Sequence, residues 1–133
     1  MQQAIRFLKH HEMEIYFTDI SNTRPEDSIE IFEANRAKVA EGNYPEQSLY
    51  SLVDASGARF NTKLIQTIKN TVKSNGPYIR STVVVGLSPL SRTIVNSIMH
   101  FTGRDMKLFD TVEEGKNHLY SQWQKHQLVA EEV

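Results

Sequence analysis

The amino-acid sequence predicts an α/β fold, a mostly parallel five-stranded sheet that begins with a hairpin and carries four helices. Short runs of β-branched and aromatic residues alternate with longer segments in which apolar residues recur every three or four positions. No repeat, low-complexity tract or Pro/Gly-rich linker divides the 133 residues. A chain of this length has material for one substantial core, so we expect residues 1–133 to form a single domain.

The elements are expected in the order β-β-α-β-α-β-α-β-α. Strands are expected at residues 5–8, 14–20, 49–54, 82–87 and 106–110, the first two as an antiparallel hairpin. Helices are expected at 25–41, 62–74, 89–102 and from 112 onward, the last with a frayed tail at 125–133. Asn61, Ser88 and Asp110-Thr111 are suitable caps for the last three helices. The continuous β-branched run at 82–87 predicts a parallel, central strand that is buried on both faces.

Strands that alternate with helices in this way have their carboxyl ends at one edge of the sheet, where ligands of such folds bind. That edge comprises the loops after Asp19, Asp54, Leu87 and Asp110. We therefore expect contacts with a partner or ligand from two segments at this edge. Their candidate residues are Asp54, Ser56, Gly57, Arg59, Phe60, Ser88, Ser91 and Arg92.

Composition excludes several functional classes. Fifteen basic and sixteen acidic residues give a net charge of −1, which argues against nucleic acid or an anionic membrane as the main partner. The absence of cysteine excludes disulfides and thiolate metal sites. Neither a signal peptide nor an apolar run long enough to insert into a membrane is present, so we expect a cytoplasmic protein.

Three stretches of the sequence resemble the SpoIIAA-like proteins, the STAS domains of anti-sigma-factor antagonists and their small bacterial relatives. They are residues 82–90, residues 101–115 and the turn at 53–57, within a likeness that extends from about Ile15 to Leu119. The resemblance implies the SpoIIAA-like architecture and a regulatory role without catalysis. Neighbouring folds of the CRAL-TRIO kind carry lipids, which adds a small apolar ligand as an alternative.

The resemblance also places Ser56 where the antagonists carry their phosphorylated serine. In this chain Ala58, Arg59, Phe60 and Asn61 follow the glycine, so the next helix is expected to begin several residues later than in the antagonists. Ser56 would then lie in a loop, away from the positive end of a helix dipole. Two interpretations remain: Ser56-Gly57 is turn chemistry alone, which we favour, or it is a phosphorylation switch.

Other polar groups have simpler explanations than catalysis. Asp19, Asp54 and Asp110 close apolar strands, as in phosphate-accepting receiver domains, but the acidic pair and the final lysine of such domains are missing. Ser88, Ser91 and Arg92 resemble an anion site at a helix N-terminus, yet N-capping by Ser88 explains them.

No histidine pair has metal-ligand spacing, and no nucleophile motif is present. We therefore expect no enzyme activity, no metal and no cofactor.

The third helix has an unusually wide apolar surface. Its apolar side chains are Leu90, Ile94, Val95, Ile98, Met99 and Phe101. Burial against the sheet and a neighbouring helix is the simpler interpretation. The alternative is an apolar patch, centred on Ile94, Val95, Ile98 and Met99, that forms a dimer contact or one wall of a ligand pocket.

The leading hypothesis is therefore a non-enzymatic regulatory module that binds a protein partner or a second copy of itself through the strand-end loops and adjacent helices. The alternative is a carrier of a small apolar or lipid-like ligand, held between the second and third helices. A module predicts a filled interior and an exposed patch on these helices. A carrier predicts a closed apolar cavity of about 300 Å³ or more.

Overall fold

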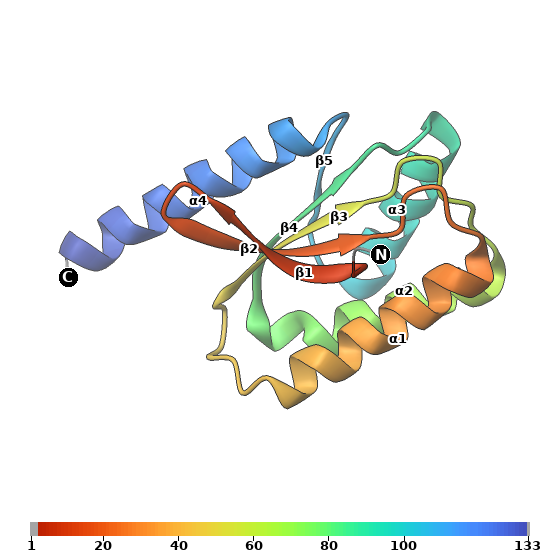
Figure 1. Cartoon of the computed structure of the whole chain (residues 1–133), viewed down its shortest axis with the longest axis horizontal. Coiled ribbons are helices and arrows are strands. Elements are labelled where there is room, and N and C mark those ends of the chain that lie inside the picture. Colours follow the sequence, from red (N-terminus) through yellow and green to blue (C-terminus); the bar gives the residue numbers. More distant parts are fainter. Residues whose placement is uncertain (1–2, 133) are drawn as a thin grey trace.

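The computed structural model describes residues 3–132 and has the predicted order of strands and helices. The elements are β1 (Ile5–His10), β2 (Met13–Asp19), α1 (Pro25–Glu41), β3 (Leu49–Asp54), α2 (Thr62–Asn75), β4 (Ile79–Val85), α3 (Pro89–Thr102), β5 (Lys107–Phe109) and α4 (Val112–Glu132). A short 3-10 turn, Gly76–Tyr78, joins α2 to β4. Figure 1 shows α1 and α2 side by side on one face of the twisted sheet, with α4 on the other.

The sheet has the sequential order β1-β2-β3-β4-β5. The β1–β2 pair is antiparallel and the three other pairs are parallel, which confirms the predicted mostly parallel sheet with an N-terminal hairpin. Right-handed crossovers between strands in sequential order place successive helices on the same face. Accordingly α1, α2 and α3 share one face, whereas α4 follows the last strand and covers the other.

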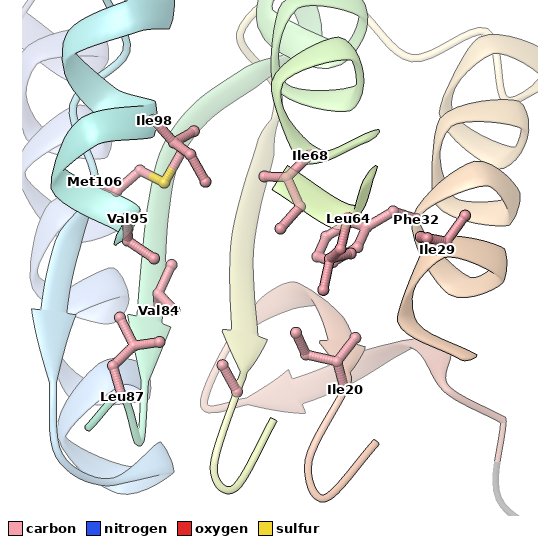
Figure 2. Packing of buried hydrophobic residues seen from close by; sticks show 11 residues of the cluster. Ile20, Ile29, Phe32, Leu64, Ile68, Val84, Leu87, Val95, Ile98 and Met106 are labelled. Carbon is pink, nitrogen blue, oxygen red and sulfur yellow. The ribbon is translucent and has the colours of Figure 1, made fainter. Parts of the chain in front are cut away.

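Each face of the sheet has its own hydrophobic core. Phe32, Leu64, Ile68, Val95 and Ile98 from α1, α2 and α3 pack over one face (Figure 2). On the opposite face, α4 packs through Leu119 against a second set of strand residues, which includes Met13, Ile15, Leu52 and Val83. Because successive strand residues point to opposite faces, Val83 and Val84 enter different cores. The continuous apolar run of β4 is thus buried on both sides.

The predicted caps account for the N-terminal ends of three helices. Asn61 Oδ1 accepts a hydrogen bond from the Leu64 amide at 2.8 Å, and Ser88 Oγ accepts one from the Ser91 amide at 3.2 Å. Thr111 and Glu114 form a capping box, in which each side chain accepts a hydrogen bond from the other residue's amide. Local side-chain chemistry therefore fixes where α2, α3 and α4 begin.

Several strand boundaries differ from the prediction by one to three residues. β4 begins at Ile79 rather than at residue 82, because Ile79 pairs with Leu49 and is buried in a third small cluster. β4 lies between β3 and β5 and is parallel to both, which agrees with the predicted interior position. α4 extends to Glu132, and residues 116–132 contain neither Gly nor Pro; the fraying of its tail stays a prediction.

A hydrogen bond between two ionisable residues, Glu12 and Tyr120, joins the tip of the β1–β2 hairpin to α4. Tyr120 donates its hydroxyl hydrogen to Glu12 Oε2 at 2.9 Å, and its ring stacks on Trp123. This hydrogen bond is the main reason why the pKa of Glu12 lies below its ordinary value of 4.5. Glu12 therefore stabilises the fold above pH 4.5, and the contribution is lost as the pH falls through the lower folded pKa.

We expect Tyr120→Phe to raise the pKa of Glu12 toward its ordinary value, because the hydroxyl that favours the carboxylate is removed. A carboxyl-detected NMR titration of Glu12 measures this directly. Tyr78→Phe, a substitution in the α2–β4 connection, is the matched control and should leave the titration unchanged. Equal curves for the native chain and Tyr120→Phe would show that the hydrogen bond is not formed in solution.

Candidate functional site

The carboxyl ends of the four parallel strands meet at one edge of the sheet. In the strand register Asp19 lies opposite Asp54, Asp54 opposite Val85, and Val85 opposite Phe109. Figure 2 shows the loops after β2, β3 and β4 leaving the sheet at this same edge. We call this edge the rim and define it by residues 19–24, 54–61, 86–92 and 110–111. Because the strand order is sequential, the rim lacks the crevice that a reversal of strand order creates in nucleotide-binding folds.

Two similar turns form the first half of the rim. Asp19 Oδ1 accepts hydrogen bonds from the Ser21 amide at 2.9 Å and the Ser21 hydroxyl at 2.6 Å. Asp54 Oδ1 accepts the equivalent bonds from Ser56, at 3.0 and 2.7 Å. These are Asx turns, in which a carboxylate takes the place of a backbone acceptor. Both aspartates therefore have a structural role.

Backbone hydrogen bonds join the two turns to each other. The Ile20 amide donates to the Asp54 carbonyl at 2.9 Å, and the Asn22 amide donates to the Ser56 carbonyl at 2.7 Å. The Arg59 amide donates to the Thr23 carbonyl at 3.3 Å. The segment between β3 and α2 is thus held in place along its length, although it has no regular secondary structure.

Ser56 lies in this loop and not at a helix end. α2 begins at Thr62, and its N-cap is Asn61. The Ser56 side chain is half-buried and lies against Gly86, where any Cβ atom would overlap Ser56 Oγ. The late start of the helix agrees with the sequence prediction, and it removes the helix dipole that would stabilise a phosphate on Ser56.

The second half of the rim is the start of α3. The Ser88 hydroxyl donates to the hydroxyl of Ser91, which is buried. Arg92 Nη2 forms an ion pair with Asp110 Oδ1 at 2.6 Å, joining α3 to the β5–α4 connection. Asp110 thus pairs with Arg92, while Thr111 caps the helix. With its guanidinium already paired, this group does not support the anion site considered from the sequence.

The structure separates the predicted site residues into three groups. Asp54 and Ser56 form the Asx turn, and Gly57 and Arg59 are exposed directly after it. Phe60 instead packs against the core under α2, where it lines a cavity. Ser88, Ser91 and Arg92 lie at the start of α3. The two segments meet where Gly86 lies against Ser56. Gly86 was not among the predicted site residues.

The predicted apolar patch on α3 lies mostly in the core, which corrects its use as an exposed surface. Val95 is 5% exposed and Ile98 is 1% exposed, while Ile94 and Met99 are half-buried at the edge of the core. The side chains of α3 that do reach solvent are Leu90 and Phe101, at 74% and 54% exposure. Burial against the sheet explains the wide apolar surface only in part.

A small cavity lies between α2, α3 and the sheet, where the sequence analysis placed a ligand pocket. Its walls include Ile68 and Val72 of α2, Val95 and Ile98 of α3, and Arg104. The volume is about 90 Å³, well below the roughly 300 Å³ at which pockets for drug-sized ligands begin. The Arg104 guanidinium donates to the Ile79 carbonyl at 2.9 Å. A cavity is therefore present between these helices, but its volume is too small for a lipid.

Within residues 3–132, no three histidine or carboxylate side chains gather in a metal-binding arrangement. None of the helices in this part of the chain combines the length and the low polarity needed to cross a membrane. Sequence reasoning missed Lys69 and Lys73, whose ammonium groups lie over the exposed Phe101 ring. Their i, i+4 spacing on one helix was a signal that could have been noticed.

Comparison with solved structures identifies the fold. An uncharacterized protein from the DUF3478 family with a SpoIIAA-like fold, from Shewanella loihica PV-4, is similar with a TM-score of 0.65 at 14% identity, over 87% of this chain and 92% of that chain. An anti-sigma-factor antagonist (STAS) domain protein from Planctomyces limnophilus has a TM-score of 0.62 at 13% identity, over 87% of this chain and 97% of that chain. The chain matches no protein-family model and no curated protein. At these identities the likeness shows the fold alone, which is SpoIIAA-like (STAS), as predicted.

Proposed function

We propose that this chain is a non-enzymatic regulatory module of the cytoplasm that binds a protein partner through the rim. STAS-like domains are commonly regulatory or interaction domains, which supports the proposal at the level of the fold. The observation that carries it is that the rim is conformationally ordered, because its two Asx turns are hydrogen-bonded to each other. A loop that is already ordered loses little conformational entropy on binding.

The exposed groups of the rim suit a protein surface better than a small molecule. Gly57 and Arg59 are exposed on one loop, and Ser88 is exposed at the start of α3. The cavity described above lies deeper than these groups, under α2 and α3. The small volume of that cavity also gives the carrier hypothesis no support, so we favour a protein partner.

A photo-crosslinking experiment in the producing cell tests this proposal. Arg59 is replaced by p-benzoylphenylalanine, and Ala37, exposed on the outer face of α1, receives the same residue as a control. We expect a discrete protein adduct from position 59 and none from position 37. Equal adduct patterns from both positions, or none from position 59, would count against the rim as a binding surface.

We further propose that Ser56 is the position at which modification would switch the rim. Its hydroxyl donates to Asp54, so a phosphate would place two anions together with no helix N-terminus to receive them. The loop would open, and partner binding would be lost. Intact-mass measurement after incubation with cell lysate and ATP, with Ser56→Ala as control, tests whether the modification occurs.

Ser56→Asp is expected to lower the free energy of unfolding by about 1–3 kcal/mol, because the carboxylate replaces a donor and faces Asp54. Urea denaturation followed by circular dichroism measures the change. Ser97→Asp, at an exposed position of α3, is the matched control and should remain within about 0.5 kcal/mol of the native chain. Equal stabilities of the two variants would mean that the Ser56–Asp54 contact does not hold the loop.

A further inference from the structure

A second surface, on the opposite side of α3 from the Arg92–Asp110 ion pair, is exposed, apolar and basic. We call it the α2–α3 face and define it by six residues: Ile65, Lys69 and Lys73 of α2, and Leu90, Ile94 and Phe101 of α3. Leu90, Ile94 and Phe101 fall on one stripe of α3 by helical spacing. Leu90 and Phe101 are exposed, while Ile65 and Ile94 are half-buried at the margin of the core. The face thus presents apolar side chains that no described residue covers completely.

The charge of α2 and α3 differs sharply from the charge of the neighbouring helix α1. α2 contains three lysines and no acidic residue, and α3 contains Arg92 and His100 and no acidic residue. The adjacent α1 contains five acidic and two basic residues. The overall charge of −1 therefore conceals two regions of opposite sign. A basic surface attracts an acidic partner and repels a basic one.

Two lysines compete for one aromatic ring on this face. The Lys69 ammonium lies 4.2 Å from the centre of the Phe101 ring, and the Lys73 ammonium lies 4.6 Å from it. Like charges at i, i+4 on a helix repel each other, which attraction to the ring offsets only in part. Among the described residues neither lysine has a carboxylate partner. A carboxylate brought by a partner would relieve this repulsion.

We propose that the α2–α3 face binds an acidic amphipathic segment of a partner protein. Apolar side chains of the segment contact Leu90, Ile94 and Phe101, and its carboxylates pair with Lys69 and Lys73. This rests on the proposed function, because it specifies the chemistry of a partner and adds a contact surface that shares only Leu90 with the rim.

A protein segment fits this face better than an anionic membrane does. α1 lies beside α2 and carries the excess of acidic residues, so a broad anionic surface would meet repulsion there. A segment of helical width contacts α2 and α3 without reaching α1.

The test places p-benzoylphenylalanine at position 101 of the full chain in the producing cell and identifies the cross-linked peptide by mass spectrometry. We expect a protein peptide in which acidic residues flank apolar ones. Lys69→Glu/Lys73→Glu should lower the adduct yield about tenfold or more, because both attractions become repulsions. Lys9→Glu/Lys38→Glu makes the same change of net charge at exposed positions elsewhere and should leave the yield unchanged. Changing the acidic residues of the captured segment to lysine should restore the adduct with Lys69→Glu/Lys73→Glu.

Several results would overturn the inference. They are the absence of an adduct, a lipid adduct, a captured peptide without acidic residues, and a yield that the lysine reversal does not lower. Capture of α1 from a second copy would replace the proposed partner by self-association. The position 59 adduct separates this inference from the proposed function. If position 59 captures a partner and position 101 does not, the rim proposal stands and this inference fails; the reverse result removes the rim and keeps the α2–α3 face.

Discussion

Gly86→Ala is expected to lower the free energy of unfolding by about 3 kcal/mol or more, the sum of a backbone term and an overlap term. Gly86 has a φ of +81°, in the region that side-chain-bearing residues rarely adopt. A Cβ atom there would overlap Ser56 Oγ and lie 2.9 Å from both Cα and Cβ of Ser56. Part of this overlap involves backbone, so the loop before α2 has to move. Urea denaturation measures the loss.

Gly103→Ala is the matched control for this substitution. Gly103 has a φ of +70° at the end of α3, but a Cβ atom at this position would meet no neighbouring atom within 4 Å, so only the backbone term of about 1–2 kcal/mol applies. The difference between the two variants therefore measures the contact between Gly86 and Ser56. Equal losses would show that the two halves of the rim do not touch. Gly86→Ala should also weaken the adduct from position 59, and Gly103→Ala should not.

The architecture was predictable because its determinants are local. Alternation of β-branched runs with segments of helical periodicity predicts which elements form. Because a helix between two strands forms a right-handed crossover that joins parallel strands, the same alternation predicts a largely parallel sheet. The helix starts were equally accessible, since Asn61, Ser88 and Thr111 act on amides within three residues of themselves. The same local reasoning correctly predicted that the helix after Ser56 begins late.

The site was harder to predict because its contacts join distant residues. Gly86 touches Ser56, and Phe101 lies beside Lys69 and Lys73, across separations that no periodicity encodes. The wide apolar surface of α3 did not reveal which part meets the sheet. With three helices on one face, α3 has α2 as its helical neighbour there, so Val95 and Ile98 are buried while other apolar side chains reach solvent. Cavity volume likewise depends on packing and not on pattern.

Asn35→Ala is expected to lower the free energy of unfolding by about 2–4 kcal/mol, because two buried polar groups lose a partner. Asn35 Nδ2 donates to Thr18 Oγ1 at 2.8 Å, and Asn35 Oδ1 accepts from Asn75 Nδ2 at 2.9 Å. All three residues are buried, so water cannot replace the lost bonds without opening the core. The network connects β2, α1 and α2, and urea denaturation again measures its contribution.

Asn75→Ala removes one bond of the network and should lower the free energy of unfolding by about 1–2 kcal/mol. The double variant should lose less than the sum of the single losses, because both single variants break the same Asn35–Asn75 bond. Asn70→Ala, at an exposed position of α2, is the control and should change stability by less than about 0.5 kcal/mol. Strictly additive losses would mean that the two amides act independently. A double variant that loses less than the sum of the single losses would mean that a directional polar contact, and not apolar packing alone, sets how α1 lies against α2.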